Sequence, residues 1–252
     1  MSVLFSPPLP HLEDSPKRIR ALFGGEYIVD TTQAKLGWTK KWYPYYYFKP
    51  SDLKSKYLVQ KAKSDGKTTT YDLVVGDKKA EGAITEYHDG FFRGLALIEF
   101  GAIDRWFEEE KQIFVHPKDP YKRVDVLQSS RHVRVELNGV ELANTTKPRL
   151  LFETLLRTRT YIPPTDVNLG LLRPSTYTTE CPYKGVANYY DVHLPDGTVA
   201  KNVVWWYRTA QPECAEIEGF LAFYDEKLDV FVDGELVGKA KIETFGLKSL
   251  EN

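Results

Sequence analysis

The sequence predicts a mainly β protein, built as two tandem domains of antiparallel sheets with one short helix in each. Three observations support this fold class. Aromatic residues, which suit strands, are abundant, with 16 Tyr, 13 Phe and 5 Trp in 252 residues. Short alternating apolar runs are separated by Gly, Pro, Asn and Asp, as in all-β proteins. The two halves of the chain also resemble each other, and such a repeat fixes the domain count.

The repeat is clearest between residues 19–36 and residues 133–150, at an offset of 114 residues. The same offset places residues 47–53 on residues 161–167 without a gap. Two further matches follow in the same order, of 71–73 with 190–192 at an offset of 119 and of 107–115 with 224–232 at an offset of 117. We therefore divide the chain into a flexible Pro-rich arm (1–14), a first copy (15–128) and a second copy (129–252).

Each copy is predicted to begin with a β-hairpin. In the second copy Asn138-Gly139 separates two alternating apolar runs, which is a strong signal for a tight hairpin turn. Gly24-Gly25 occupies the same place in the first copy. Residues 161–166 contain two prolines, so we expect an extended edge or a loop there.

The rest of the second copy reads as strands around one short helix. Residues 186–192 alternate as a strand that follows a turn at Cys181. Residues 201–208 are apolar on both faces, which predicts a central strand covered on each side. Residues 211–218, with Pro at the first turn, predict the short helix. The last strands are expected at 220–224, 228–232 and 235–237.

Composition excludes several classes of function. The net charge of −1 offers no basic surface for nucleic acid. No apolar run approaches the ~20 residues of a membrane helix, and the N-terminus lacks the pattern of a secretory signal. Two cysteines and five scattered histidines fit neither a disulfide framework nor a zinc site, so we expect a cytoplasmic protein without metal or cofactor.

The candidate site is the turn Cys181-Pro-Tyr-Lys-Gly185. Cys181 is a possible nucleophile whose pKa Lys184 would lower, although most free cysteines are simply buried. Lys184 is a candidate for anion binding or Schiff-base chemistry, or an ordinary exposed turn lysine. Aromatic side chains nearby would either hold a substrate or pack the sheet. The candidate substrate-binding residues are Tyr183, Tyr189, Trp205 and Tyr207, with Tyr161 and Arg149 joining them from the segment after the first hairpin.

This motif, together with Tyr189-Tyr190, Pro212-Glu213 and Val232-Asp233-Gly234, resembles the family catalogued as domain of unknown function 427. The resemblance covers nearly all of the second copy and implies a β-tent fold, in which two antiparallel sheets are pinned at one edge. Many β-tent relatives bind zinc through two Cys-x-x-Cys pairs, which this sequence lacks. The first copy has residues 63–67 in place of the Cys181 motif, so we consider it degenerate.

The family carries a nucleotidyltransferase-like label, for which we would expect paired acidic metal ligands and a Gly-rich phosphate loop. Neither pattern occurs in this sequence. Our first hypothesis is instead a metal-independent enzyme that acts on a small organic molecule through Cys181 or Lys184. The alternatives are a non-catalytic small-molecule-binding or adaptor module, and a purely structural turn. The pocket is expected within the second copy or between the copies, in a monomer that forms an intrachain pseudo-dimer.

Overall fold

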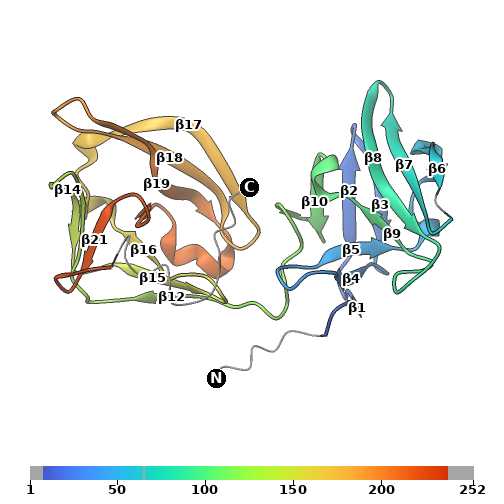
Figure 1. The fold of residues 1–252 in the computed structure, drawn as a ribbon, viewed down its shortest axis with the longest axis horizontal. Helices are drawn as coiled ribbons and strands as arrows, with labels where there is room; N and C mark the ends of the chain where they lie inside the picture. The colour runs from blue at the N-terminus through green and yellow to red at the C-terminus, as the bar shows by residue number, and fades with distance from the viewer. Residues whose placement is uncertain (1–7, 65, 238–252) are drawn as a thin grey trace. The chain divides into compact units, whose positions relative to one another are not determined.

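A computed structural model describes residues 8–64 and 66–237 of the chain (Figure 1). The chain divides into two compact units between Tyr121 and Lys122. The second unit therefore begins earlier than residue 129, because strand β12 (Val124–Gln128) pairs with β15 of that unit. Residues 11–14, expected in a flexible arm, instead form strand β1, which pairs with β4.

The first unit contains two antiparallel sheets. The seven-stranded sheet has the order β1-β4-β5-β9-β8-β7-β6, and the four-stranded sheet has the order β11-β10-β2-β3. The strands of the larger sheet are β1 (His11–Asp14), β4 (Lys35–Trp38), β5 (Tyr45–Phe48), β9 (Ala96–Ile98), β8 (Lys78–Tyr87), β7 (Thr68–Val75) and β6 (Leu58–Ser64). Those of the smaller sheet are β11 (Lys111–Ile113), β10 (Arg105–Glu108), β2 (Ile19–Phe23) and β3 (Glu26–Thr31).

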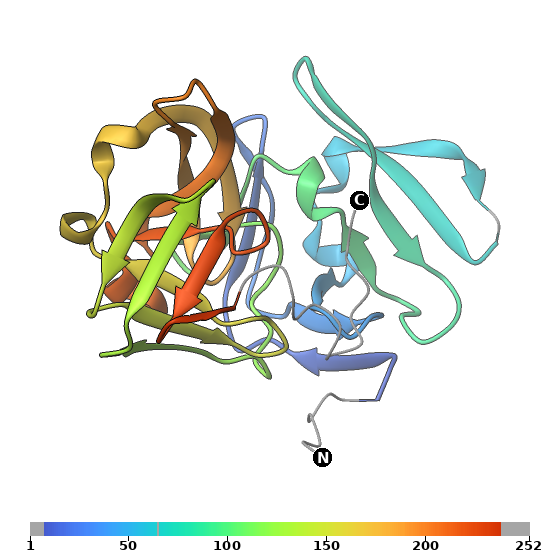
Figure 2. The same cartoon turned by 60° about the vertical axis from the view of Figure 1, so that its left-hand side comes forward.

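The second unit repeats this plan with the orders β12-β15-β16-β20-β19-β18-β17 and β14-β13-β21-β22. Figure 2 shows its smaller sheet, with the red strand β21 beside the green strands β13 and β14. The larger sheet adds to β12 the strands β15 (Arg149–Glu153), β16 (Arg159–Ile162), β20 (Leu221–Phe223), β19 (Val199–Ala210), β18 (Gly185–His193) and β17 (Leu172–Cys181). The smaller sheet comprises β14 (Val140–Thr145), β13 (Val133–Leu137), β21 (Asp229–Val232) and β22 (Glu235–Leu236).

The two units match strand for strand, so the predicted pair of antiparallel β modules is confirmed. Small details repeat as well. In the first unit Asp72 accepts a hydrogen bond from the backbone N–H of Gly82 at 2.7 Å, and in the second unit Asp191 accepts one from Asn202 at 2.7 Å. The fourth sequence match, of residues 107–115 with 224–232, was placed wrongly. Strand pairing aligns β10 with β21, so Trp106 corresponds to Val230 and the offset there is 124 rather than 117.

The predicted hairpins form at the expected turns, and β19 is central as expected. The segment with two prolines was predicted incompletely. Tyr161 and Ile162 lie in β16, a central strand, and the 3-10 turn Pro164–Asp166 follows it. The helix predicted at 211–218 is a 3-10 turn, Pro212–Ile217, with a kink at Cys214. The other helical segments of the described residues are 3-10 turns of three residues: Pro50–Asp52, Ser55–Tyr57, Phe100–Ala102 and Leu169–Leu171.

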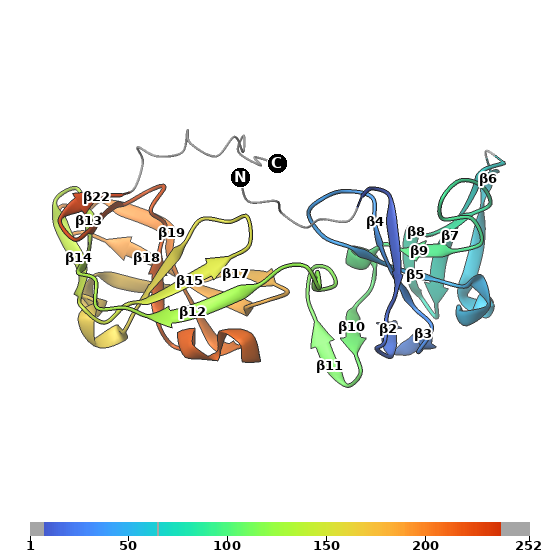
Figure 3. The same cartoon turned by 90° about the horizontal axis from the view of Figure 1, so that it is seen from below.

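The second unit buries apolar side chains on both faces of its larger sheet. One cluster fills part of the space between the two sheets, with Val133 and Val204 fully buried. The other lies on the opposite face around Tyr161, under the 3-10 turn Pro212–Ile217 and β12. Figure 3 shows this turn, drawn as an orange coil, beside β12. A candidate site residue of this sheet can therefore lie on the face toward the smaller sheet or on the opposite face.

Candidate functional site

The Cys181 turn connects the last residue of β17 to the first residue of β18. Cys181 pairs directly with Gly185, and Gln211 N–H donates a hydrogen bond to the Lys184 carbonyl at 3.1 Å. Gly185 has φ +103°, and a Cβ at this position would lie 3.1 Å from the Thr209 carbonyl oxygen. The glycine is therefore required by the backbone, because a side chain would be strained and crowded.

Lys184 forms a buried ion pair rather than an exposed turn contact. Its Nζ donates to Glu153 Oε2 at 2.5 Å, and the side chains of Lys184 and Glu153 are only 14% and 7% exposed. Burial alone would lower the pKa of Lys184, but the nearby Cys181 and Glu153 raise it above its ordinary value. A Schiff-base nucleophile must be a neutral amine, whereas this environment favours the charged ammonium. Lys184 is therefore better suited to stabilising a negative charge than to nucleophilic attack.

The two thiols of the chain differ in accessibility. Cys181 is partly exposed, whereas Cys214 is fully buried. Burial raises the pKa of Cys214 to about 11, against the favourable field of Lys184. Because the thiolate is the reactive form, Cys214 is an inert core residue and Cys181 is the accessible one.

The predicted substrate-binding rings are packed into the sheet. Tyr161, Tyr183, Tyr189, Trp205 and Tyr207 are each at most 6% exposed. Trp205 Nε1 donates to the Tyr161 hydroxyl at 3.3 Å, and the Tyr189 hydroxyl lies 2.9 Å from Thr179 Oγ1. Burial raises the pKa of Tyr161 to about 12 and raises that of Tyr207 further, so both phenols stay protonated. These contacts describe a filled core face and not an open aromatic pocket.

Arg149 lies at the edge of the same face. Its Nε is 3.4 Å from Glu216 Oε2, and its guanidinium packs over the Phe220 ring at 5.3 Å. The structure thus brings Cys181, Lys184, Tyr161 and Tyr207 into one electrostatic neighbourhood, together with Glu153 and Cys214. None of the eight predicted site residues lines a hollow that opens elsewhere in the second unit.

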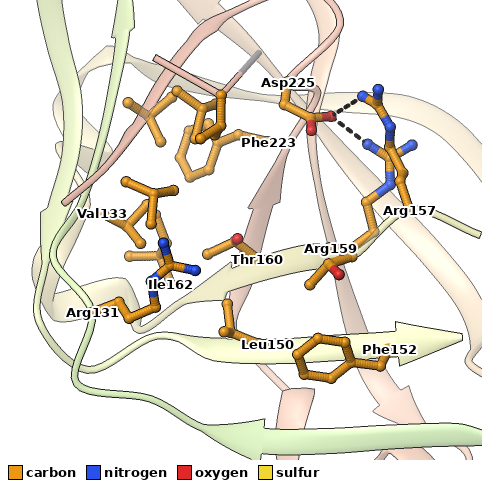
Figure 4. A pocket seen from close by; sticks show the side chains of 15 residues that line it. Arg131, Val133, Leu150, Phe152, Arg157, Arg159, Thr160, Ile162, Phe223 and Asp225 are labelled. Carbon is orange, nitrogen blue, oxygen red and sulfur yellow. Dashed lines mark hydrogen bonds and ion pairs between the residues drawn. The ribbon is translucent and has the colours of Figure 1, made fainter. Parts of the chain in front are cut away.

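That hollow is a cleft of about 300 Å³ between the two sheets of the second unit. Its apolar walls come from both sheets, with Val133 and Val230 on the smaller sheet and Leu150 and Ile162 on the larger one. Figure 4 shows Phe223 across the cleft from Leu150 and Phe152, with Thr160 between them. This volume is at the lower end of the range of small-molecule sites.

In the first unit large rings take the place of small side chains that line this cleft. Trp106 corresponds to Val230, since each pairs with the equivalent residue of the first hairpin strand. Tyr46 corresponds to Thr160 in the same way. In the first unit the Trp106 ring stacks on Phe100 at 5.0 Å and on Tyr46 at 6.3 Å. Replacement of rings by small side chains at these positions therefore favours open space in the second unit.

One end of the cleft carries a fixed network of four charges. Asp225 Oδ1 accepts hydrogen bonds from Arg157 Nη1 at 2.9 Å and Arg159 Nη1 at 2.6 Å. Glu226 pairs with Arg159 Nη2 at 2.8 Å and lies 3.2 Å from Arg157. Burial and the hydrogen bond with Glu226 raise the pKa of Asp225. Burial also acts to raise the pKa of Glu226, but the hydrogen bonds with Arg159 and Asp225 and the charge of Arg159 together outweigh it and lower the pKa to about 2.

The opposite side of the cleft carries Arg131 (Figure 4). Its Nε donates to Asp233 Oδ2 at 2.7 Å, and both side chains are about half exposed, at 55% and 50%. Solvent screens such a pair, so it contributes little to stability.

Sequence reasoning missed the cleft and its charged residues Arg131, Arg157, Arg159 and Asp225. A signal was present in the repeat, because Tyr46 aligns with Thr160 at the offset of 114 residues already found. An aromatic residue in one copy that aligns with a small residue in the other indicates that the two interiors differ in volume. The equivalent change at Val230 was hidden because the fourth match was misplaced.

The described residues contain no group of three or more His, Cys, Asp or Glu side chains arranged to hold a metal ion. Within the same part of the chain, no helix has the length and apolarity needed to cross a membrane.

Comparison with known proteins adds one finding. No curated protein matches the chain. A family model does match it twice, over residues 11–102 and 125–234, one match in each unit. These matches cover most of the chain and agree with the duplicated fold. The chain therefore belongs to the family described as domain of unknown function 427, as a tandem member.

Proposed function

We propose that the second unit binds a small organic molecule, without catalysis, in the cleft between its two sheets. The observation that carries this proposal is the replacement of stacked rings by small side chains at Val230 and Thr160, which leaves about 300 Å³ open. A packed core normally leaves few voids larger than a water molecule, and closing this one would stabilise the unit. An open apolar hollow with a few polar groups at its ends is the usual form of a ligand site.

The test is to close the cleft with the rings of the first unit. N-phenyl-1-naphthylamine is a neutral probe whose fluorescence rises in apolar surroundings. We expect it to bind the wild-type chain, and Val230→Trp to abolish at least nine-tenths of the fluorescence gain. Thr160→Tyr provides a second, independent plug. Val199→Trp is the matched control, because Val199 is exposed and does not line the cleft. Unchanged probe binding in both plugged variants, confirmed as folded by circular dichroism, would refute the proposal.

A second candidate function is thiol chemistry at Cys181, as in an enzyme that is independent of metal. Two observations favour it: Cys181 is the partly exposed thiol, and Lys184 is held protonated nearby by Glu153. A fixed ammonium stabilises a thiolate. In this role Lys184 supplies charge, and the rings around Tyr161 support the turn.

Labelling with iodoacetamide tests this candidate. Cys181 should react faster than N-acetylcysteine at pH 7, and Lys184→Met should remove that advantage. Cys181→Ser identifies the labelled site by mass spectrometry. A rate at or below that of N-acetylcysteine would leave Cys181 as a structural residue and favour binding alone.

We also propose a cytoplasmic location and a monomeric state. Both cysteines are free thiols, which suits a reducing compartment. Two modules in one chain form an intrachain pseudo-dimer, which would replace a homodimer of single modules. Light scattering after size-exclusion chromatography should give the mass of one chain, and a stable dimer at micromolar concentration would contradict this.

A further inference from the structure

The cleft of the second unit is lined by more cationic than anionic side chains. Three arginines line it, and Asp225 is the single carboxylate among the lining residues. The three are Arg131, Arg157 and Arg159, and they reach the cleft from two sides (Figure 4). Each arginine also has a carboxylate partner, so the strength with which that partner holds it decides which one is available to an anionic ligand.

Two of these arginines are fixed in place. Arg157 and Arg159 share Asp225 Oδ1, and Glu226 joins both, so each guanidinium is held by two carboxylates. Arg159 is held further by its position over the Trp205 ring at 5.4 Å. Their charge is largely neutralised by these partners. They form a rigid polar wall, but they are poor candidates for capturing a new anion.

Arg131 is neither held by two carboxylates nor fixed in place in this way. Its carboxylate partner, Asp233, does not line the cleft, and the pair is half exposed. A guanidinium presents five N–H donors in a fork that matches a carboxylate or a phosphate, and Arg131 uses Nε for Asp233. Turning this side chain toward a ligand therefore breaks only a weak, screened contact.

Resting on the proposed function, we propose that the ligand is an organic anion, with an apolar body in the cleft and a carboxylate or phosphate held by Arg131. The body lies against Leu150, Phe152 and Phe223, and the Thr160 hydroxyl is placed for one further hydrogen bond. The first unit does not share this chemistry, because Trp106 and Tyr46 occupy the corresponding space.

Three probes with one common body test the charge preference. We would titrate the full chain calorimetrically with 1-naphthamide, 1-naphthoate and 1-naphthyl phosphate, at low ionic strength. The wild-type chain should bind at least one anion about tenfold more tightly than the amide, as expected for one charge-assisted contact. The tighter of the two anions identifies the headgroup class, and either result supports the proposal.

Arg131→Gln should reduce the ratio of anion to amide affinity about tenfold. Arg123→Gln is the matched control, because Arg123 is an exposed arginine of the same unit that pairs with Asp125 and does not line the cleft. This control should leave the ratio unchanged.

Equal binding of amide and anions, with both blocked by Val230→Trp, would overturn the anion proposal and leave the proposed function intact. Failure of all three naphthyl probes and of N-phenyl-1-naphthylamine would overturn both. An equal loss of selectivity in Arg131→Gln and Arg123→Gln would show a general charge effect and overturn the assignment to Arg131.

Discussion

The two units of this chain have the same strands in the same order but different interiors. In the first unit Trp106 is 2% exposed and stacks among Tyr46, Phe48 and Phe100 between the sheets. In the second unit the position of Trp106 is taken by Val230, and a cleft remains. The comparison teaches that the sheet framework tolerates loss of its central rings, so the second copy is free to carry a hollow.

The outer faces of the larger sheets differ as well. Tyr47 of the first unit stacks on Phe92 at 4.3 Å, with Gly37 leaving room for the ring. The equivalent Tyr161 of the second unit lies near the Lys184–Glu153 ion pair. The first unit therefore has an apolar contact where the second has buried charge.

Breaking the buried charge pair should give the largest effect. Lys184→Met leaves Glu153 buried without its cation, which should cost about 3–5 kcal/mol of the free energy of unfolding of the second unit. Glu153→Leu added to it should restore most of that loss, since a well-packed apolar pair is often as stable as an ion pair. Urea denaturation of the single and double variants measures both values. A double variant no more stable than Lys184→Met would show that the pair is not the source of the cost.

Exchanging the residues that distinguish the interiors should give the next largest effect. Trp106→Val empties a packed position and should destabilise the first unit by about 3 kcal/mol. Val230→Trp fills existing space and should change the stability of the second unit by less than about 1 kcal/mol. The two urea midpoints check this asymmetry. Equal destabilisation by both substitutions would mean that the second interior is as closely packed as the first.

Much of the fold was predictable from local patterns and from the repeat. The Asn138-Gly139 and Gly24-Gly25 turns fix the hairpins, and the apolar alternation of β19 marks a central strand. The cleft was not predictable in the same way. Whether a strand face is filled depends on side chains from distant strands, such as Val230 opposite Thr160 across the two sheets, and local alternation carries no information on that distance.

The candidate site shows the same limit. A tight turn and a neighbouring strand place Cys181 and Lys184 beside β18 and β19, but their role as a site stays a prediction. The role given to the rings as pocket walls stays a prediction that the packing of Tyr161 and Tyr207 does not favour. Aromatic alternation looks the same for a packed face and a binding face.

The charge network at the cleft predicts that the stability of the second unit depends on pH in acid. The first unit lacks this source, because Phe100 occupies the position that corresponds to Asp225. Glu226 has its pKa lowered to about 2, so its stabilisation is complete above about pH 4.5 and is lost as the pH falls toward 2. The raised pKa of Asp225 has the opposite sign, because its contribution is lost as the pH rises. Thermal melting from pH 5 to 2 should show a shallower acid decline in Glu226→Gln than in the wild type. Identical slopes would exclude Glu226 as a source.

The smallest effect is expected at the hairpin turns. Asn138→Gly should change stability by no more than about 0.5 kcal/mol, since both residues accept φ near +51°. The reverse change in the first copy, Gly24→Asn, should cost about 1–2 kcal/mol, because its Cβ would lie 3.0 Å from Val75. Urea unfolding of the two variants provides the comparison, and equal costs would contradict the crowding at Gly24.

Strand β17 forms the outer edge of the larger sheet of the second unit, and its irregularity has a consequence for solubility. An open edge is a template on which another chain can add a strand, which is a common route to aggregation. Pro174 has no N–H to offer, and the ladder is interrupted between Pro174 and Thr178. A ten-residue edge is thereby reduced to two short stretches, which protects a duplicated β protein from joining its sheets to those of neighbouring molecules.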